Sequence, residues 1–254
     1  MPTPNGKTLL FAEDEPELLD IYSQWFERRG YNVLCATNGK DALSLCESHK
    51  VDLVISDVRM AEGDGIELAR RLKDRSERSP LIVFLTGFAD VSAEETYDLG
   101  VCCILNKPID RAEMVWAVER FLQAPRQLWA APVTVQPQIK VEKDYESLES
   151  AISQGELNFG RGGLFVRNCE DVPENHSLEF NFKFSEKRIP IVDGYGILRW
   201  RRTVQDDDLP KGVGIEILRL GQQALDAVTE WISNARPKAF IPRAGWKRPV
   251  RAIP

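Results

Sequence analysis

Five short apolar runs alternate with helical patterns between residues 8 and 122, and this alternation limits the possible folds more than any other feature of the chain. The runs are TLLFA, NVLCA, LVISD, LIVFL and CCILN. Apolar residues follow one another without polar alternation, which is typical of parallel strands covered on both faces. The first helical pattern starts near Pro16, carries an apolar stripe that includes Ile21 and Phe26, and ends at Gly30. Five β–α units with right-handed crossovers predict an open, doubly wound, five-stranded parallel sheet.

Polar side chains follow four of the five predicted strands. Glu13 and Asp14 come after the first strand, Asp57 after the third, Thr86 after the fourth and Lys107 after the fifth. In a doubly wound sheet these strand ends share one edge, and ligands bind there. Clustered carboxylates repel one another unless a cation joins them, and a site made of oxygen atoms suits Mg²⁺. We therefore expect a magnesium site at which a carboxylate attacks a phosphoryl donor, while an ammonium and a hydroxyl stabilise the charge on the phosphoryl oxygens.

The segments AEDE, DLVISDVRMAEGDG, FLTG and NKPID resemble the receiver domain of two-component response regulators, over nearly all of residues 7–123. The resemblance implies a flavodoxin-like fold with Asp57 as the phosphoacceptor. It also implies a sensor histidine kinase or a phosphotransfer protein as the phosphodonor. Such a chain is a signalling protein and not an enzyme, because the receiver catalyses only its own phosphoryl transfer and dephosphorylation.

The same resemblance assigns roles to the other residues at the strand ends. Thr86 is implied as the switch hydroxyl and Lys107 as the lysine that contacts the phosphoryl group. Glu13 and Asp14 are implied as metal-binding acids. The phosphoacceptor itself and the backbone carbonyl of Arg59 complete the expected magnesium ligands.

Three residues depart from the receiver pattern. Glu13 replaces the commoner Asp, Ala61 stands where Pro is usual, and Ile104 occupies the position of the aromatic switch residue. Because Ile104 has no ring to turn inward, we expect the signal to pass through backbone and helix shifts instead. We also expect the bulky Arg59 and Phe88 to flank the pocket, hinder hydrolytic water and slow the loss of the phosphoryl group.

The remaining chain differs in character. Residues 124–139 contain three prolines and no consistent period, which predicts a semi-rigid linker between the receiver, residues 1–123, and a second domain, residues 140–235. Short alternating segments separated by turn residues predict a small antiparallel β-barrel or sandwich, closed by a helix at about residues 222–233. Through NFGRGG, GILRW and GVGIEIL, this region resembles a PilZ domain, a small β-barrel often used as a cyclic di-GMP receptor.

The PilZ ligand motifs are incomplete in this chain. Asn158 and Gly163 fit the second motif of that family, but Gly160 replaces its serine. The arginine pair of the first motif is missing, and Lys140 and Lys143 are the basic residues upstream. Each charged hydrogen bond contributes about 1.5 to 3 kcal/mol, so the loss of several would weaken nucleotide binding about a thousandfold or more. We therefore interpret the glycines as a tight turn, with a nucleotide cradle as the alternative.

Four arginines of the second domain have two possible roles. They would form a substitute cyclic di-GMP site, or they would lie on a solvated strand face. The four are Arg161, which stands beside the motif residues, Arg199, Arg201 and Arg202. The solvated face is the simpler hypothesis. Trp200 stands at the position of a core aromatic residue, so we interpret it as packing.

The last 19 residues, 236–254, carry six basic residues, no acid and four prolines, which predicts a basic, extended tail. This tail would contact anionic lipid, nucleic acid or an acidic partner, or it would be a disordered end. The contacts would be made by Arg243, Trp246, Lys247, Arg248 and Arg251. No helix-turn-helix pattern is present and the net charge is -6, so we expect no direct DNA binding.

Cellular location and redox state follow from simple patterns. The apolar runs are far shorter than the roughly 18 residues that a membrane span requires, so we expect no transmembrane segment. The N-terminus lacks a secretory signal pattern, which predicts a cytoplasmic protein. The five cysteines are odd in number and form no C-x-x-C pair, so we expect reduced thiols.

The sequence therefore predicts a bacterial response regulator that is phosphorylated on Asp57 and signals through a degenerate PilZ-like domain. We expect that domain to mediate mainly protein interaction with an unidentified downstream partner. The alternative is a cyclic di-GMP receptor whose ligand binding is tuned by phosphorylation, and a third possibility is a phosphate-independent scaffold. A homodimer is compatible with the sequence.

Overall fold

The computed structural model describes most of the chain as two compact units, Met1–Leu122 and Gln123–Pro254. No helix in the described part of the chain is long and apolar enough to cross a membrane. The described residues are 6–73, 80–87, 99–130, 132, 136–137, 139–160, 162–169, 173, 175–186, 191–203 and 211–234.

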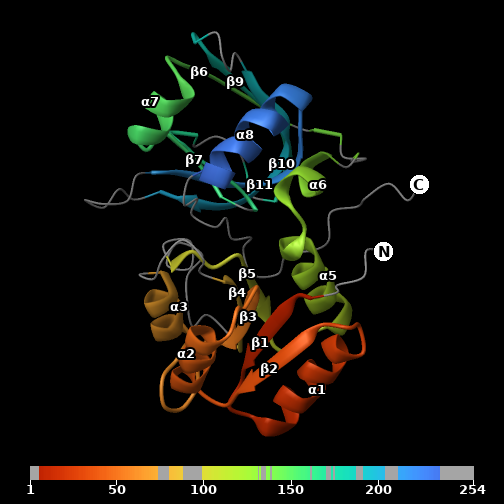
Figure 1. The fold of residues 1–254 in the computed structure, drawn as a ribbon. Helices are drawn as coiled ribbons and strands as arrows, with labels where there is room; N and C mark the ends of the chain where they lie inside the picture. The colour runs from red at the N-terminus through yellow and green to blue at the C-terminus, as the bar shows by residue number, and fades with distance from the viewer. Residues whose placement is uncertain are drawn as a thin grey trace. The chain divides into compact units, whose positions relative to one another are not determined.

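The first unit contains a five-stranded parallel sheet with the strand order β2-β1-β3-β4-β5 (Figure 1). This confirms the predicted doubly wound sheet. The order reverses beside β1, whose two neighbours are β2 and β3, and such a reversal opens a crevice at the carboxyl ends of the strands. The strands are β1 (Thr8–Ala12), β2 (Asn32–Ala36), β3 (Leu53–Asp57), β4 (Leu81–Thr86) and β5 (Cys103–Asn106).

Helices cover both faces of this sheet, with α1 and α5 on one side and α2 and α3 on the other (Figure 1). Pro16 opens α1 with Glu17 in its first turn, which suits the free N–H groups and the positive end of the helix dipole. The Asn38 side chain caps α2 by accepting a hydrogen bond from the Asp41 N–H at 2.8 Å. Ile21 was expected in the apolar stripe of α1, but it is 43% exposed. The helices are α1 (Pro16–Glu27), α2 (Gly39–Ser48), α3 (Gly65–Lys73) and α5 (Arg111–Leu122).

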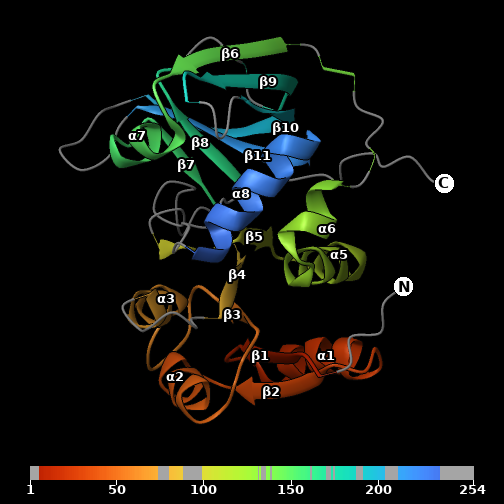
Figure 2. The same ribbon diagram turned by 45° about the horizontal axis from the view of Figure 1, so that its top comes forward.

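The second unit contains a six-stranded sheet with the order β6-β9-β10-β11-β8-β7 (Figure 2). The prediction of a purely antiparallel sheet is wrong, because β6 pairs with β9 in parallel. A parallel pair needs a long crossover connection, and the chain between these two strands is long enough to carry α7, β7 and β8. The strands are β6 (Ile139–Tyr145), β7 (Leu157–Phe159), β8 (Gly163–Arg167), β9 (Ser177–Phe184), β10 (Ile191–Arg202) and β11 (Gly212–Leu220).

This sheet is curled, but the described residues show no ladder between its two edge strands, β6 and β7. Register shifts in β10, after Tyr195 and after Leu198, mark bulges of the kind that bend a strand. The Lys143 ammonium of β6 donates hydrogen bonds to the carbonyl oxygens of Arg167 and Asn168, at the end of β8, at 2.8 and 2.9 Å. The edge strand β6 is thereby tied to the far side of the curled sheet.

Three helices accompany the second sheet: α6 (Pro125–Ala130), α7 (Leu148–Ser153) and α8 (Gln222–Asn234). The helix predicted at about residues 222–233 is confirmed as α8. The linker predicted at 124–139 is wrong in its first half, because α6 contacts α8 and β11. Pro125 is tolerated in the first turn of a helix, and Leu128 and Trp129 are buried in the core of the second unit.

Trp200 packs within the second unit, as predicted. It is 1% exposed and its ring stacks on Phe165, with 5.8 Å between the ring centroids. Gly214 lies opposite Trp200 on β11, and a side chain at residue 214 would overlap the indole. The glycine therefore makes room for the ring across the strand pair.

Candidate functional site

The three acids predicted at the strand ends lie together in the first unit. Ala12 of β1 pairs with Ser56 of β3, so Glu13, which follows β1, lies beside Asp57, the last residue of β3. One carboxylate oxygen from each of Glu13, Asp14 and Asp57 lies within 4.8 Å of the others. Such a cluster of oxygen ligands is typical of Mg²⁺ sites.

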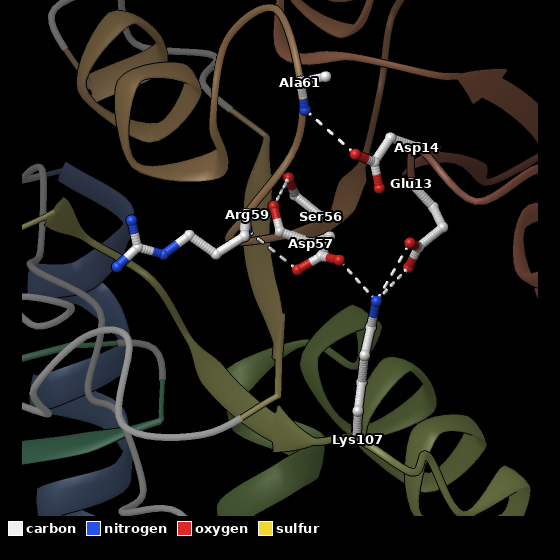
Figure 3. Close-up of polar contacts among 7 residues, drawn as sticks. All are labelled: Glu13, Asp14, Ser56, Asp57, Arg59, Ala61 and Lys107. Atoms are coloured by element: carbon white, nitrogen blue, oxygen red, sulfur yellow. Dashed lines mark hydrogen bonds and ion pairs between the residues drawn. The ribbon is translucent and has the colours of Figure 1, made fainter.

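Lys107 joins two of these acids (Figure 3). Its Nζ lies 2.5 Å from Oδ2 of Asp57, and 3.1 and 2.8 Å from Oε1 and Oε2 of Glu13. Lys107 directly follows β5, which places its side chain at the same edge of the sheet as the acids. One ammonium therefore neutralises part of a cluster that contains three carboxylates.

The pKa values of Lys107 and Glu13 report the balance of burial and charge in the cluster. Burial lowers the pKa of Lys107, but the hydrogen bonds and charges of Asp57 and Glu13 outweigh it, so that pKa is raised above its ordinary value. Burial raises the pKa of Glu13, and the opposing effect of Lys107 does not fully offset it. The ammonium alone does not compensate the buried negative charge, so a further cation would stabilise the cluster.

The loop after β3 supplies further contacts to the acids. The Arg59 N–H donates to Oδ1 of Asp57, and the Ala61 N–H donates to Oδ2 of Asp14, each at 3.1 Å. The Ser56 hydroxyl donates to the backbone carbonyl of Asp57 at 2.8 Å. The two backbone N–H groups orient both carboxylates. The sequence interpretation missed the roles of Ser56 and Ala61. A backbone donor such as the Ala61 N–H leaves no mark on residue type, and the Ser56 hydroxyl binds only the neighbouring backbone.

The side chain of Arg59 points away from the three acids (Figure 3). This orientation does not support the expectation that Arg59 hinders hydrolytic water. The sequence does not fix the orientation, because a side chain on a loop can turn to either side of the backbone. Phe88, the other residue named for this role, lies outside the described residues.

Thr86 completes the set at the strand ends. It is the last residue of β4 and is 3% exposed, and its carbonyl oxygen accepts a hydrogen bond from the Lys107 N–H at 2.7 Å. Ile104, at the position of the aromatic switch residue, is buried in β5. The structure thus brings all five predicted side chains to one edge of the first sheet.

The predicted nucleotide-binding residues of the second unit lie in and around a β-hairpin. Asn158 is in β7, Gly163 begins β8, and the Gly160 N–H donates to the Gly163 carbonyl oxygen at 2.8 Å. This hydrogen bond confirms the tight turn. Arg161 lies outside the described residues.

The solvated arginine face is wrong for Arg199 and Arg202, each 5% exposed. The Arg199 guanidinium donates to Oε2 of Glu216 at 2.7 and 2.9 Å, so a buried ion pair on neighbouring strands replaces the expected solvation. The Arg202 guanidinium lies 5.7 Å from the centroid of the Trp200 ring. Arg201 is half-buried.

The other basic residues named from the sequence have different places. Lys140 is exposed and forms an ion pair with Glu142 at 2.9 Å, while Lys143 ties β6 to the end of β8. The tail residues lie outside the described part of the chain; they are Arg243, Trp246, Lys247, Arg248 and Arg251.

Comparison with known proteins identifies relatives of the first unit. Residues 9–119 match the family model of the response regulator receiver domain. The chain is 32% identical to the transcriptional regulatory protein GlrR of Escherichia coli (strain K12) over 115 residues, which cover 45% of this chain and 26% of GlrR. It is 29% identical to the polar-differentiation response regulator DivK of Brucella anthropi over 118 residues, which cover 46% of this chain and 96% of DivK.

Among solved structures, the chain is similar to the chemotaxis response regulator CheY4 of Vibrio cholerae, with 25% identity and a TM-score of 0.42. That match covers 45% of this chain and 97% of CheY4. The chain spans about a quarter of the length of GlrR, one of the curated relatives it matches. The family match includes every predicted residue at the strand ends and stops before the second unit.

Proposed function

We propose that this chain, in which residues 9–119 form a response regulator receiver domain, accepts a phosphoryl group on Asp57 from a sensor histidine kinase or a phosphotransfer protein. The observation that carries the proposal is the position of Lys107, whose ammonium contacts both Asp57 and Glu13 beside a third acid, Asp14. An acceptor carboxylate, a cation site and a fixed ammonium are what phosphoryl transfer to a carboxylate requires.

In the proposed reaction, a carboxylate oxygen of Asp57 attacks the phosphorus atom of the donor. The new O–P bond makes an acyl phosphate as the P–N bond to the donor histidine breaks, and the nitrogen keeps that electron pair. Lys107 already contacts Asp57, so it is placed to bind an oxygen of the incoming phosphoryl group. The Thr86 hydroxyl is proposed as a second donor to that group.

Glu13, Asp14, Asp57 and the backbone carbonyl of Arg59 would hold Mg²⁺. When bound, Mg²⁺ neutralises negative charge on the carboxylates and on the phosphoryl oxygens. The raised pKa of Glu13, caused mainly by burial, supports a cation at this cluster.

Beryllofluoride, a stable mimic of a phosphoryl group, tests this proposal. With Mg²⁺ present, we expect a saturable adduct with the parent chain and none with Asp57→Asn, which keeps the shape of the side chain and removes its charge. Fluorine NMR of the bound species distinguishes the two proteins. Equal binding by both would count against Asp57 as the acceptor, and no adduct with the parent chain would favour a phosphate-independent scaffold.

For the second unit, we propose a PilZ-like output domain that acts mainly through protein interaction. The proposal rests on the NFGRGG, GILRW and GVGIEIL segments and on a curled sheet that is accompanied by the helix α8. It is supported by the missing arginine pair and by the use of Arg199 in a buried ion pair with Glu216. Affinity capture with the phosphorylated and unphosphorylated chain, compared by mass spectrometry, should yield a partner whose recovery depends on phosphorylation. Identical recovery in both states would contradict a phosphorylation-dependent output.

A cyclic di-GMP receptor is the second candidate function, favoured by the place of Asn158 and Gly163 on the two strands of one hairpin. Gly160 and Arg161, which stand between those strands in the sequence, would complete that site. Calorimetric titration of the full chain with cyclic di-GMP separates the two candidates. Binding at micromolar concentration or tighter would favour the receptor, and no detectable binding would favour protein interaction.

A further inference from the structure

Gly39, the first residue of α2, contacts the backbone of the loop that follows β3. The Gly39 N–H donates a hydrogen bond to the Gly63 carbonyl oxygen at 2.9 Å. A methyl group at residue 39 would overlap that oxygen and would lie 2.9 Å from the Gly63 carbonyl carbon. Real methyl carbons essentially never approach backbone atoms this closely, so any side chain at residue 39 must displace either α2 or the loop.

The loop is residues 58–64, and it carries two elements of the proposed cation site. The Ala61 N–H holds the Asp14 carboxylate, and the Arg59 carbonyl is a proposed metal ligand (Figure 3). At its base, the Gly65 N–H donates to the Val58 carbonyl oxygen at 3.0 Å. The loop is therefore closed at its base by this hydrogen bond. It is held in its middle, at Ala61, by Asp14, and near its end, at Gly63, by Gly39.

The start of α2 is the more rigid partner in this contact. The Asn38 side chain caps the helix through the Asp41 N–H, and the Ala42 N–H donates to the Asn38 carbonyl oxygen at 3.1 Å. Ala42 is fully buried. A group added at residue 39 would therefore move the loop more readily than the helix.

We propose that Gly39 is a positioning residue for the cation site. It brings the start of α2 close enough to Gly63 to hold the loop where the Ala61 N–H orients Asp14. The inference rests on the proposed Mg²⁺ site in the receiver domain. Gly39 touches neither cation nor substrate, so its effect passes through the loop.

Helix propensity alone predicts that an alanine at residue 39 stabilises α2 and leaves the loop in place. Alanine is the better helix former, and the φ angle of Gly39 lies outside the left-handed region, so Gly39→Ala would favour α2 if the contact with Gly63 had no consequence. A loss of cation affinity in Gly39→Ala would therefore come from the displaced loop.

The test compares full-length Gly39→Ala with the parent chain and with Gly100→Ala. Gly100 also lies in the first unit, at a φ of 75° with nothing within 4 Å of an added methyl group, so alanine there strains the backbone without touching the loop. Mg²⁺ affinity, measured by calorimetry well below the unfolding temperature, should fall at least fivefold in Gly39→Ala. It should stay within twofold of the parental value in Gly100→Ala.

A second readout needs no cation. In the metal-free protein, amide hydrogen exchange at Ala61 should speed up in Gly39→Ala and stay parental in Gly100→Ala, because only the first substitution disturbs the contact with Asp14. Parental exchange and parental affinity in Gly39→Ala would overturn the inference, and so would equal losses in both variants. A parent chain that binds no Mg²⁺ would overturn the proposed function, while exchange at Ala61 would still decide whether Gly39 positions the loop.

If Gly39→Ala does not fold, Asn38→Ala loosens the same helix start without added bulk. We expect it to weaken Mg²⁺ binding by more than the twofold margin set for Gly100→Ala and to speed exchange at Ala61, because the cap that fixes α2 against the loop is lost. Parental values of both quantities in Asn38→Ala would count against the inference.

Discussion

Replacing Lys107 by methionine removes the ammonium that lies between Asp57 and Glu13. Methionine keeps much of the length of the side chain, so the substitution mainly removes charge. The two carboxylates it leaves behind are buried, with 9% and 1% of their side chains exposed. In the absence of a cation, the two carboxylates then repel each other, and the folded state loses stability.

The size of the effect follows from burial. Removing one partner of a buried ion pair costs about 3 to 5 kcal/mol, and we expect about 3 kcal/mol because the Lys107 side chain is 18% exposed. Mg²⁺ should compensate, because the carboxylates of Lys107→Met lack the ammonium and should bind the cation more tightly than those of the parent, and tighter binding stabilises the folded state more. The stability gap between variant and parent should therefore narrow in saturating Mg²⁺.

Scanning calorimetry of the full chain measures both quantities. With EDTA at neutral pH, the transition of the first unit should occur roughly 10 °C lower in Lys107→Met than in the parent. Because the pKa of Lys107 is raised, its contribution is fully present below its ordinary pKa of 10.5 and is lost only as the pH rises through the raised value. The stability gap should also narrow in acid, where Glu13, whose pKa is raised mainly by burial, takes up a proton.

Two results would refute this reasoning. If Lys107→Met melts with the parent in EDTA, the ion pairs contribute nothing to stability. If Mg²⁺ raises both melting temperatures by the same amount, the ammonium and the cation do not compete for the same carboxylates.

Further predictions concern both units. In metal-free protein, burial raises the pKa of Glu13, so the stability of the first unit should fall as the pH rises from the ordinary pKa of 4.5 through the raised value. Urea unfolding should show this fall in the parent and not in Glu13→Gln. The same dependence of stability on pH in both proteins would contradict this prediction. Glu216→Gln should destabilise the second unit by about 3 to 5 kcal/mol in urea unfolding, because it leaves the Arg199 charge buried, and the double variant Arg199→Met with Glu216→Leu should recover most of that loss. Trp129→Ala should lower the free energy of unfolding of the second unit by about 3 to 5 kcal/mol in the same measurement, because Trp129 of α6 is part of the core. A parental value would instead favour a linker at this segment.

The first sheet could be predicted nearly residue by residue. TLLFA, NVLCA and LVISD coincide with β1, β2 and β3. For β1 and β3 the reason is that strands covered on both faces appear as unbroken apolar runs. The strand order then brings the polar residues at the strand ends to one edge, so the members of the site could be predicted too. Their contacts could not, because the reach of Lys107 to Glu13 joins side chains 94 positions apart.

The second unit was harder to predict because non-local contacts decide its structure. The prolines of 124–139 favoured a linker, yet Pro125 opens α6 and Trp129 is buried. The parallel pairing of β6 with β9 depends on a crossover, which leaves no local pattern. The sequence favoured a surface position for Arg199, but its guanidinium donates to Glu216 of the neighbouring strand β11, and this contact depends on strand pairing that no local pattern shows.

Mass spectrometry of the chain after incubation with acetyl phosphate and Mg²⁺ tests phosphorylation of Asp57 most directly. We predict an acid-labile mass increase of one phosphoryl group that maps to the peptide containing Asp57 and is absent in Asp57→Asn. An unmodified parent chain, or an adduct that persists in Asp57→Asn, would contradict the proposal that Asp57 accepts the phosphoryl group.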